Sequence, residues 1–64
     1  METKIVICYR NYKNEIKFYT IIPSRLFFGK TEYYPEEQWL LDAYVFEKDA
    51  NRTFALKNII QWGV

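Results

Sequence analysis

A strand-like run of residues 38–46 dominates the hydrophobic pattern, because it is the longest stretch rich in aromatic and β-branched residues and free of Gly and Pro. Successive side chains of a strand point to opposite faces. This alternation places one apolar set on a single face: Trp39, Leu41, Ala43 and Val45. We therefore predict a central strand whose apolar face, Trp39 included, belongs to the core.

The chain after this strand carries the signals of a hairpin. Residues 47–51 contain Asp49 and Asn51, which are common turn formers. Residues 52–56 resume the strand pattern, with Phe54 on an apolar face. We predict that this segment pairs antiparallel with the central strand and that Phe54 is a second large core residue.

Two earlier strands are predicted before the central one. Residues 4–12 form a continuous apolar run and residues 15–22 alternate. Pro23 is expected to end the second strand because proline cannot donate to a ladder. Residues 24–28 fit either a short strand or a loop. Residues 29–37 form one long irregular stretch, of a length that is usually functional or anchored by its own aromatics.

The end of the chain completes an all-β pattern. Residues 57–60 are typical of one helical or 3₁₀ turn, and residues 61–64 of a short closing strand. We predict a single domain over residues 1–64, a small SH3-like barrel of about five strands with one 3₁₀ turn before the last strand. An open meander that closes by dimerising is the alternative. Sixty-four residues bury only a marginal core, so thirteen aromatic side chains matter for stability.

Several of these residues form a pattern that resembles the WYL domain: Trp39-Leu40-Leu41, Ala43-Tyr44, Arg52-Thr53-Phe54 and Ile59. Residues 9–12 followed by residues 21–23 are similar to the first hairpin of that family, and residues 29–32 and 35–39 are similar to very short WYL-like proteins of bacteriophages and bacteria. The resemblance implies an SH3-like barrel that senses a ligand. Some members of the family bind nucleotides or single-stranded nucleic acid through a basic surface.

The chain departs from the WYL pattern at three places. Leu40 occupies the position of the middle Tyr of the family motif. Tyr19 stands where the family often has an Arg four residues before the Pro. Both departures remove side chains that contact ligands in the family. The first turn has Lys13-Asn14 in place of Gly, which Asn tolerates because it adopts positive φ readily.

Composition narrows the possible chemistry. The chain has no His, its net charge is +1, and its one cysteine, Cys8, is expected to be a small buried hydrophobe in a reducing compartment. There is no nucleophile–base pair, no Gly-rich phosphate loop and no metal-ligand spacing. We therefore expect no enzyme activity, no metal and no cofactor. No apolar run is long enough for a membrane span, and a signal peptide is not expected, so we expect a cytoplasmic protein.

Basic residues that have aromatic neighbours are the sharpest functional signal. Guanidinium groups bind phosphates bidentately and aromatic faces stack on bases. We predict a ligand-binding patch for a nucleotide or short single strand formed by Arg10, Arg25, Lys30, Tyr34 and Arg52. In a phage, such a module could sequester a host signalling nucleotide. Taken one at a time, each Arg is also explained as a surface charge of a small barrel.

Two kinds of protein partner follow from the apolar content. A protein-interaction module that docks on a host protein through Tyr33, Tyr34 and Trp62 is the alternative function, and the near-neutral charge favours it. Half of the residues are hydrophobic, more than a lone small barrel can cover, so we also predict a homo-oligomer. The short last strand would leave an edge open for it.

Overall fold

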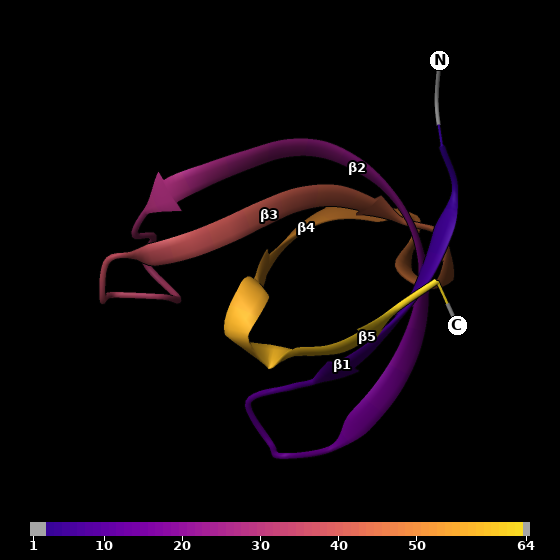
Figure 1. The fold of residues 1–64 in the computed structure, drawn as a ribbon, viewed down its shortest axis with the longest axis horizontal. Helices are drawn as coiled ribbons and strands as arrows, with labels where there is room; N and C mark the ends of the chain where they lie inside the picture. The colour runs from indigo at the N-terminus through magenta and orange to yellow at the C-terminus, as the bar shows by residue number, and fades with distance from the viewer. Residues whose placement is uncertain (1–2, 64) are drawn as a thin grey trace.

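Five antiparallel strands form one sheet in the computed structural model, which describes residues 3–63. The strands are β1 (Ile5–Arg10), β2 (Ile16–Gly29), β3 (Gln38–Val45), β4 (Ala50–Ala55) and β5 (Ile59–Trp62). The short 3₁₀ turns are η1 (Phe46–Lys48) and η2 (Leu56–Asn58). The order across the sheet is β4-β3-β2-β1-β5, so β1 to β4 form a meander and β5 returns to the far side of β1 (Figure 1). The all-β prediction and the β3–β4 hairpin are confirmed.

The second strand is much longer than predicted, because Pro23 does not end it. β2 runs through Pro23, with a register shift between Pro23 and Arg25 that leaves Ser24 as an extra residue. A bulge is one of the few places in a sheet where proline is tolerated. The Ser24 hydroxyl donates to the Asp42 carbonyl across the shift, at 3.0 Å. The strand thus continues where the sequence predicted a stop.

The length of β2 lets the sheet curl. Its first part, up to Ile21, pairs with β1, and its second part, from Ile21, pairs with β3. In Figure 1 this strand sweeps around the molecule, so that β1 and β5 lie across from β3 and β4. Among the described residues the edge strands β4 and β5 do not pair with each other, so the sheet is open. The predicted closing strand begins two residues earlier than expected, and Val64 lies outside the described residues.

The core lies on the concave face of the curled sheet. Its cluster consists of buried residues from all five strands: Ile7, Tyr9, Ile21, Leu41, Ala43, Val45, Phe54 and Ile59. Phe54 is only 5% exposed and packs edge-on against Tyr9, with ring centroids 4.8 Å apart, so its predicted core role is confirmed. Cys8 is buried and unoxidised on the other face of β1, as predicted.

Trp39 is not a core residue, and that prediction is wrong. Its side chain is 52% exposed and contacts Phe28, which lies opposite it in the β2–β3 ladder. β1 pairs with β2 only up to Ile21, and β4 pairs with β3 only as far as Leu40. Trp39 therefore lies beyond both neighbouring strands, where nothing curls over its face.

Two tight turns need left-handed backbone, and polar residues provide it. Asn14, in the β1–β2 turn, has a φ of 63°, and Asp49, after η1, has a φ of 47°. Asn and Asp adopt this region more readily than other non-glycine residues. The replacement of glycine by Lys13-Asn14 in the first turn is therefore compatible with its geometry. Within residues 3–63 we find no helix long and apolar enough to cross a membrane.

Candidate functional site

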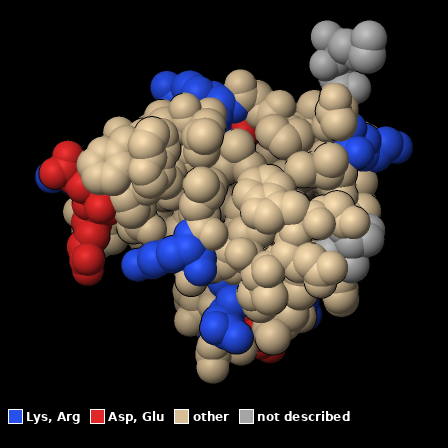
Figure 2. Space-filling view, in the orientation of Figure 1, with Lys and Arg blue, Asp and Glu red and all other residues tan. Residues whose placement is uncertain are grey.

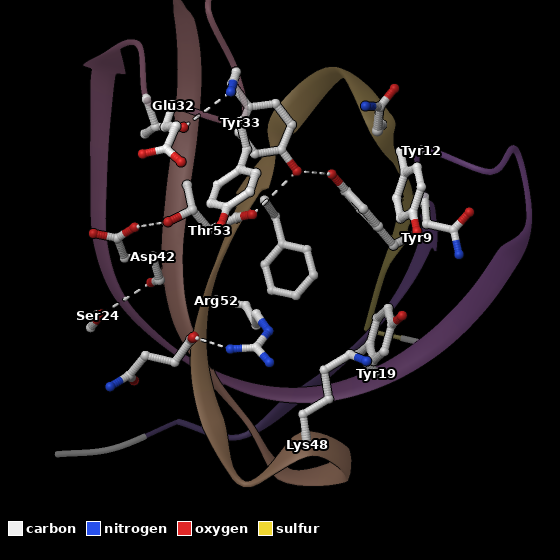
Figure 3. A pocket seen from close by; sticks show the side chains of 16 residues that line it. Tyr9, Tyr12, Tyr19, Ser24, Glu32, Tyr33, Asp42, Lys48, Arg52 and Thr53 are labelled. Carbon is white, nitrogen blue, oxygen red and sulfur yellow. Dashed lines mark hydrogen bonds between the residues drawn. The ribbon is translucent and has the colours of Figure 1, made fainter.

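The concave side of the sheet opens into a hollow rich in tyrosine, which we call the tyrosine hollow. Five tyrosines and two cations belong to its lining: Tyr9, Tyr12, Tyr19, Tyr33, Tyr34, Lys48 and Arg52. Tyr12 comes from the β1–β2 turn and Tyr33 from the segment between β2 and β3, and Figure 3 shows their rings on opposite sides of the hollow. These two rings are 92% and 84% exposed, so both are available to a ligand.

A chain of hydrogen bonds joins the wall of the hollow to the free edge of β4. The Tyr9 and Tyr34 hydroxyls are 3.0 Å apart. The Ala55 amide donates to the Tyr9 hydroxyl at 3.2 Å, and the Tyr34 hydroxyl donates to the Thr53 carbonyl at 3.3 Å. Each hydroxyl has one proton, so Tyr9 must be the donor to Tyr34. The direction runs from the Ala55 amide through both tyrosines to the Thr53 carbonyl.

This chain of hydrogen bonds does what a neighbouring strand would do. β4 is an edge strand, and unpaired edge groups are a liability. Two tyrosine hydroxyls satisfy one amide and one carbonyl of that edge, and they hold residues 30–37 against it. Tyr34 is fixed further by its own backbone, whose amide donates to the Thr31 hydroxyl at 3.1 Å. The irregular segment is therefore anchored by its own aromatic residue.

Burial raises the pKa of two tyrosine hydroxyls that line the hollow, Tyr34 and Tyr19. Desolvation first, and then the hydrogen bond with Tyr9, raise the pKa of Tyr34 well above its usual value. Desolvation, together with the charges of Tyr9, Glu47 and Glu15, also raises the pKa of Tyr19. Both groups are neutral at physiological pH, so they can donate hydrogen bonds and do not repel an anion.

The two cations of the hollow have no carboxylate partner. The one ion pair within residues 3–63 joins Arg25 to Asp42, at 3.2 Å. Arg52 donates only to the carbonyl of its neighbour Asn51, at 3.0 Å. The Lys48 ammonium lies 5.8 Å from the centre of the Tyr19 ring. Figure 3 shows the Arg52 guanidinium and the Lys48 side chain on the same side of the hollow.

Three nearby carboxylates are engaged elsewhere, whereas Glu32, which also belongs to the lining, is not engaged within residues 3–63. Asp42 accepts from Arg25 and from the Thr53 hydroxyl, the latter at 2.6 Å. Glu47 accepts the Thr20 amide with both oxygens, at 2.8 and 3.0 Å. Asp49 accepts from the Tyr44 hydroxyl. Lys48 and Arg52 thus form no ion pair among the described residues, although Glu32 and Asp42 bring negative charge to the same lining.

The five residues of the predicted patch do not meet at one place. Tyr34 and Arg52 line the tyrosine hollow, whereas Arg10, Arg25 and Lys30 lie outside its lining. Arg10 lies at the exposed end of β1, and Lys30 follows β2 directly. Arg25 is held by Asp42, and its guanidinium stacks 4.1 Å above the Phe27 ring. Figure 2 agrees with this dispersal, because the Lys and Arg side chains visible on that face lie apart around a broad uncharged surface.

Sequence reasoning missed Lys48 and Tyr19 as members of the site. Lys48 belongs to a turn with the alternating charges of an ordinary surface, and Tyr19 was read only as a departure from a family pattern. Lys48 precedes Arg52 closely, at the end of η1 just before β4, whereas Tyr19 reaches the hollow through the curl of β2, which no local spacing signals. Within residues 3–63, no group of three or more carboxylate, Cys or His side chains is placed to hold a metal ion.

No protein-family model, curated protein or solved structure matches this chain. The resemblance to the WYL domain therefore rests on the motif residues alone, and the site must be argued from its geometry.

Proposed function

We propose that this chain is a stand-alone WYL-like binding module, and not an enzyme, whose tyrosine hollow binds a nucleotide or a short single strand of nucleic acid. The observation that carries the proposal is the pair of cations without an ion-pair partner among the described residues, Lys48 and Arg52, in the same hollow as the exposed rings of Tyr12 and Tyr33. Phosphate is the natural counter-ion for such a pair, and bases stack on tyrosine. In a phage-infected bacterium, such a module would sequester a host signalling nucleotide.

The same proposal includes the SH3-like barrel as the architecture. The curl of one five-stranded sheet, with η2 directly before the last strand, supports it. The unpaired edges of β4 and β5 would then be the gap of a partly open barrel. Tyr9 and Tyr34 cover part of the β4 edge in that gap.

The test is calorimetric titration at low salt with nucleoside triphosphates, short oligothymidylates and inorganic triphosphate. Arg52→Ala should weaken nucleotide binding about ten- to a hundredfold, since a hydrogen bond to a charged group contributes about 1.5–3 kcal/mol. Its melting temperature should hardly change because the side chain is exposed and has no ion pair. Arg10→Ala is the matched control, an exposed arginine outside the hollow, and should bind as the wild type does.

Tyrosine variants separate stacking from charge. Tyr12→Ala or Tyr33→Ala should weaken binding of oligothymidylate while leaving inorganic triphosphate binding unchanged, because base–aromatic stacking contributes about 1–3 kcal/mol per base. If the wild type binds none of these compounds at low salt, or if Arg10→Ala weakens binding as much as Arg52→Ala, the proposed site is wrong.

A protein-interaction module is the second candidate, and the exposed aromatic side chains favour it. Phe28, Trp39 and Trp62 are all about half exposed. Salt separates the two candidates. Phosphate binding weakens steeply as salt is added, whereas docking of aromatic side chains hardly responds.

A further inference from the structure

Two exposed apolar patches lie at the two ends of β2, and they carry opposite charge. Residues 10–18 contain Arg10, Lys13 and Lys17 against Glu15, a net charge of +2. Residues 28–39 contain Lys30 against Glu32, Glu36 and Glu37, a net charge of −2. The protein as a whole has a net charge of only +1, so these two segments carry charges that nearly cancel over the whole chain.

The first patch, which we call the basic patch, consists of Arg10, Lys13, Ile16 and Phe18. Arg10 lies directly opposite Ile16 in the β1–β2 ladder, and Phe18 lies two residues further along the same face of β2. Ile16 and Phe18 are each more than half exposed. An arginine thus stands beside two apolar side chains that no other element covers.

The second patch, which we call the acidic patch, consists of Leu26, Phe28, Trp39, Glu36 and Glu37. Leu26, Phe28 and Trp39 lie on one face of the β2–β3 ribbon, and each is more than half exposed. Glu36 and Glu37 directly precede the start of β3. Figure 2 shows Asp and Glu side chains gathered at the end of the molecule where Figure 1 places the β2–β3 connection.

Neither patch neutralises the other within one molecule. The one ion pair within residues 3–63 joins Arg25 to Asp42, which belong to neither patch. Each patch therefore has apolar side chains facing water together with charges that have no partner. A partner surface with the opposite charge and with apolar side chains would both cover the apolar residues and pair the charges. A second copy of the chain has such a surface.

We propose that copies of this chain associate head to tail, with the basic patch of one copy on the acidic patch of the next. The two patches are different surfaces, so the contact is heterologous and leads to a closed ring or an open chain of copies. Burial of Phe18, Phe28 and Trp39 supplies the apolar contact. The opposite charges select the register of the two copies and speed their encounter.

The test uses charge reversal at each end, with sedimentation velocity as the readout. Wild-type protein should associate at low salt as its concentration rises, and high salt should weaken the association. The variant with Arg10→Glu and Lys13→Glu, and the variant with Glu36→Lys and Glu37→Lys, should each associate at least about tenfold more weakly. Lys57→Glu, an exposed charge in neither patch, is the control and should behave as the wild type does.

Mixing the two reversed variants is the decisive step. One has two acidic ends and the other has two basic ends, so each repels itself and attracts the other. The mixture should recover association, because the patch over residues 10–18 of each variant then meets the opposite charge on the patch over residues 28–39 of the other. Phe18→Ser and Trp39→Ser weaken the apolar contact without altering charge, and both should lower association. A wild type that stays monomeric at low salt, or a mixture that stays monomeric, would overturn the proposal.

Discussion

The two halves of the β2–β3 ladder contain similar apolar pairs in similar positions, but only one half is buried. Ile21 lies opposite Val45, and both are fully buried, whereas Phe28 lies opposite Trp39, and both are about half exposed. β1 and β4 flank the first pair, and neither reaches the second. The comparison teaches that alternation decides which side chains share a face, and that neighbouring strands decide whether the face is buried.

The largest expected effect is at the buried half. Phe54→Ala removes an aromatic ring packed against both Tyr9 and Tyr19, and loss of such a ring costs about 3–5 kcal/mol. A domain of this size has little more stability than that. We expect the variant to be largely unfolded at room temperature by circular dichroism. Phe18→Ala, at an exposed position of β2, should remain folded, and equal losses in both variants would contradict the comparison.

Removal of one hydroxyl should loosen the edge of the buried half. Tyr34→Phe leaves the Thr53 carbonyl without its donor and Tyr9 without its acceptor, at a cost of about 1–3 kcal/mol. Urea denaturation measures the loss, and hydrogen exchange should show faster exchange of the Ala55 amide. Tyr33→Phe is the matched control, since its exposed ring lies one residue away, and it should change neither quantity.

At the exposed half the expected loss is smaller. Trp39→Ala breaks the edge-to-face contact with Phe28, whose ring centre is 5.4 Å away, and such pairs contribute about 0.5–1.5 kcal/mol. The variant should stay folded, with a slightly lower urea midpoint. A double-mutant cycle with Phe28→Ala should recover that coupling. Unfolding as complete as that of Phe54→Ala would show that Trp39 is a core residue after all.

The smallest effect concerns Glu47, at the border of the buried half. Burial alone would raise its pKa, but hydrogen bonds led by the Thr20 amide hold that pKa below its usual value. Its contribution to stability is therefore present at neutral pH and is lost as the pH falls through the lowered pKa. Glu47→Gln should cost less than about 1 kcal/mol at neutral pH, because the group is exposed. That difference, measured by urea denaturation over a series of pH values, should vanish in acid.

The sequence predicted the secondary-structure elements better than it predicted which of their side chains are buried. The five strands, the β3–β4 hairpin and the burial of Phe54 follow from alternation and turn chemistry, which are local. The exposure of Trp39 depends on where two other strands stop, and no local pattern contains that information.

The candidate site was predictable only in part, for the same reason. Arg52 and Tyr34 were found because each stands beside aromatic residues in the sequence, yet so do Arg10 and Arg25, which lie elsewhere. The two cations of the hollow come from the adjacent elements η1 and β4, and the curl of β2 decides which tyrosines face them. Whether a cation is free of an ion pair depends on the carboxylates near it, as the ion pair between Arg25 and Asp42 shows.

The bulge at Ser24 inserts one extra residue into β2 and thereby shifts the alternation of its side chains between the two faces. Before it, odd-numbered residues such as Ile21 lie on the concave face of the sheet, and after it even-numbered residues such as Phe28 lie on that face. When the hydrophobic alternation is followed along the whole strand by residue number, the part before the bulge and the part after it have opposite phase, so no single period of two is seen. Deletion of this one residue would restore a single period along the strand and leave every later side chain of β2 on the face and opposite the β3 partner that it has now.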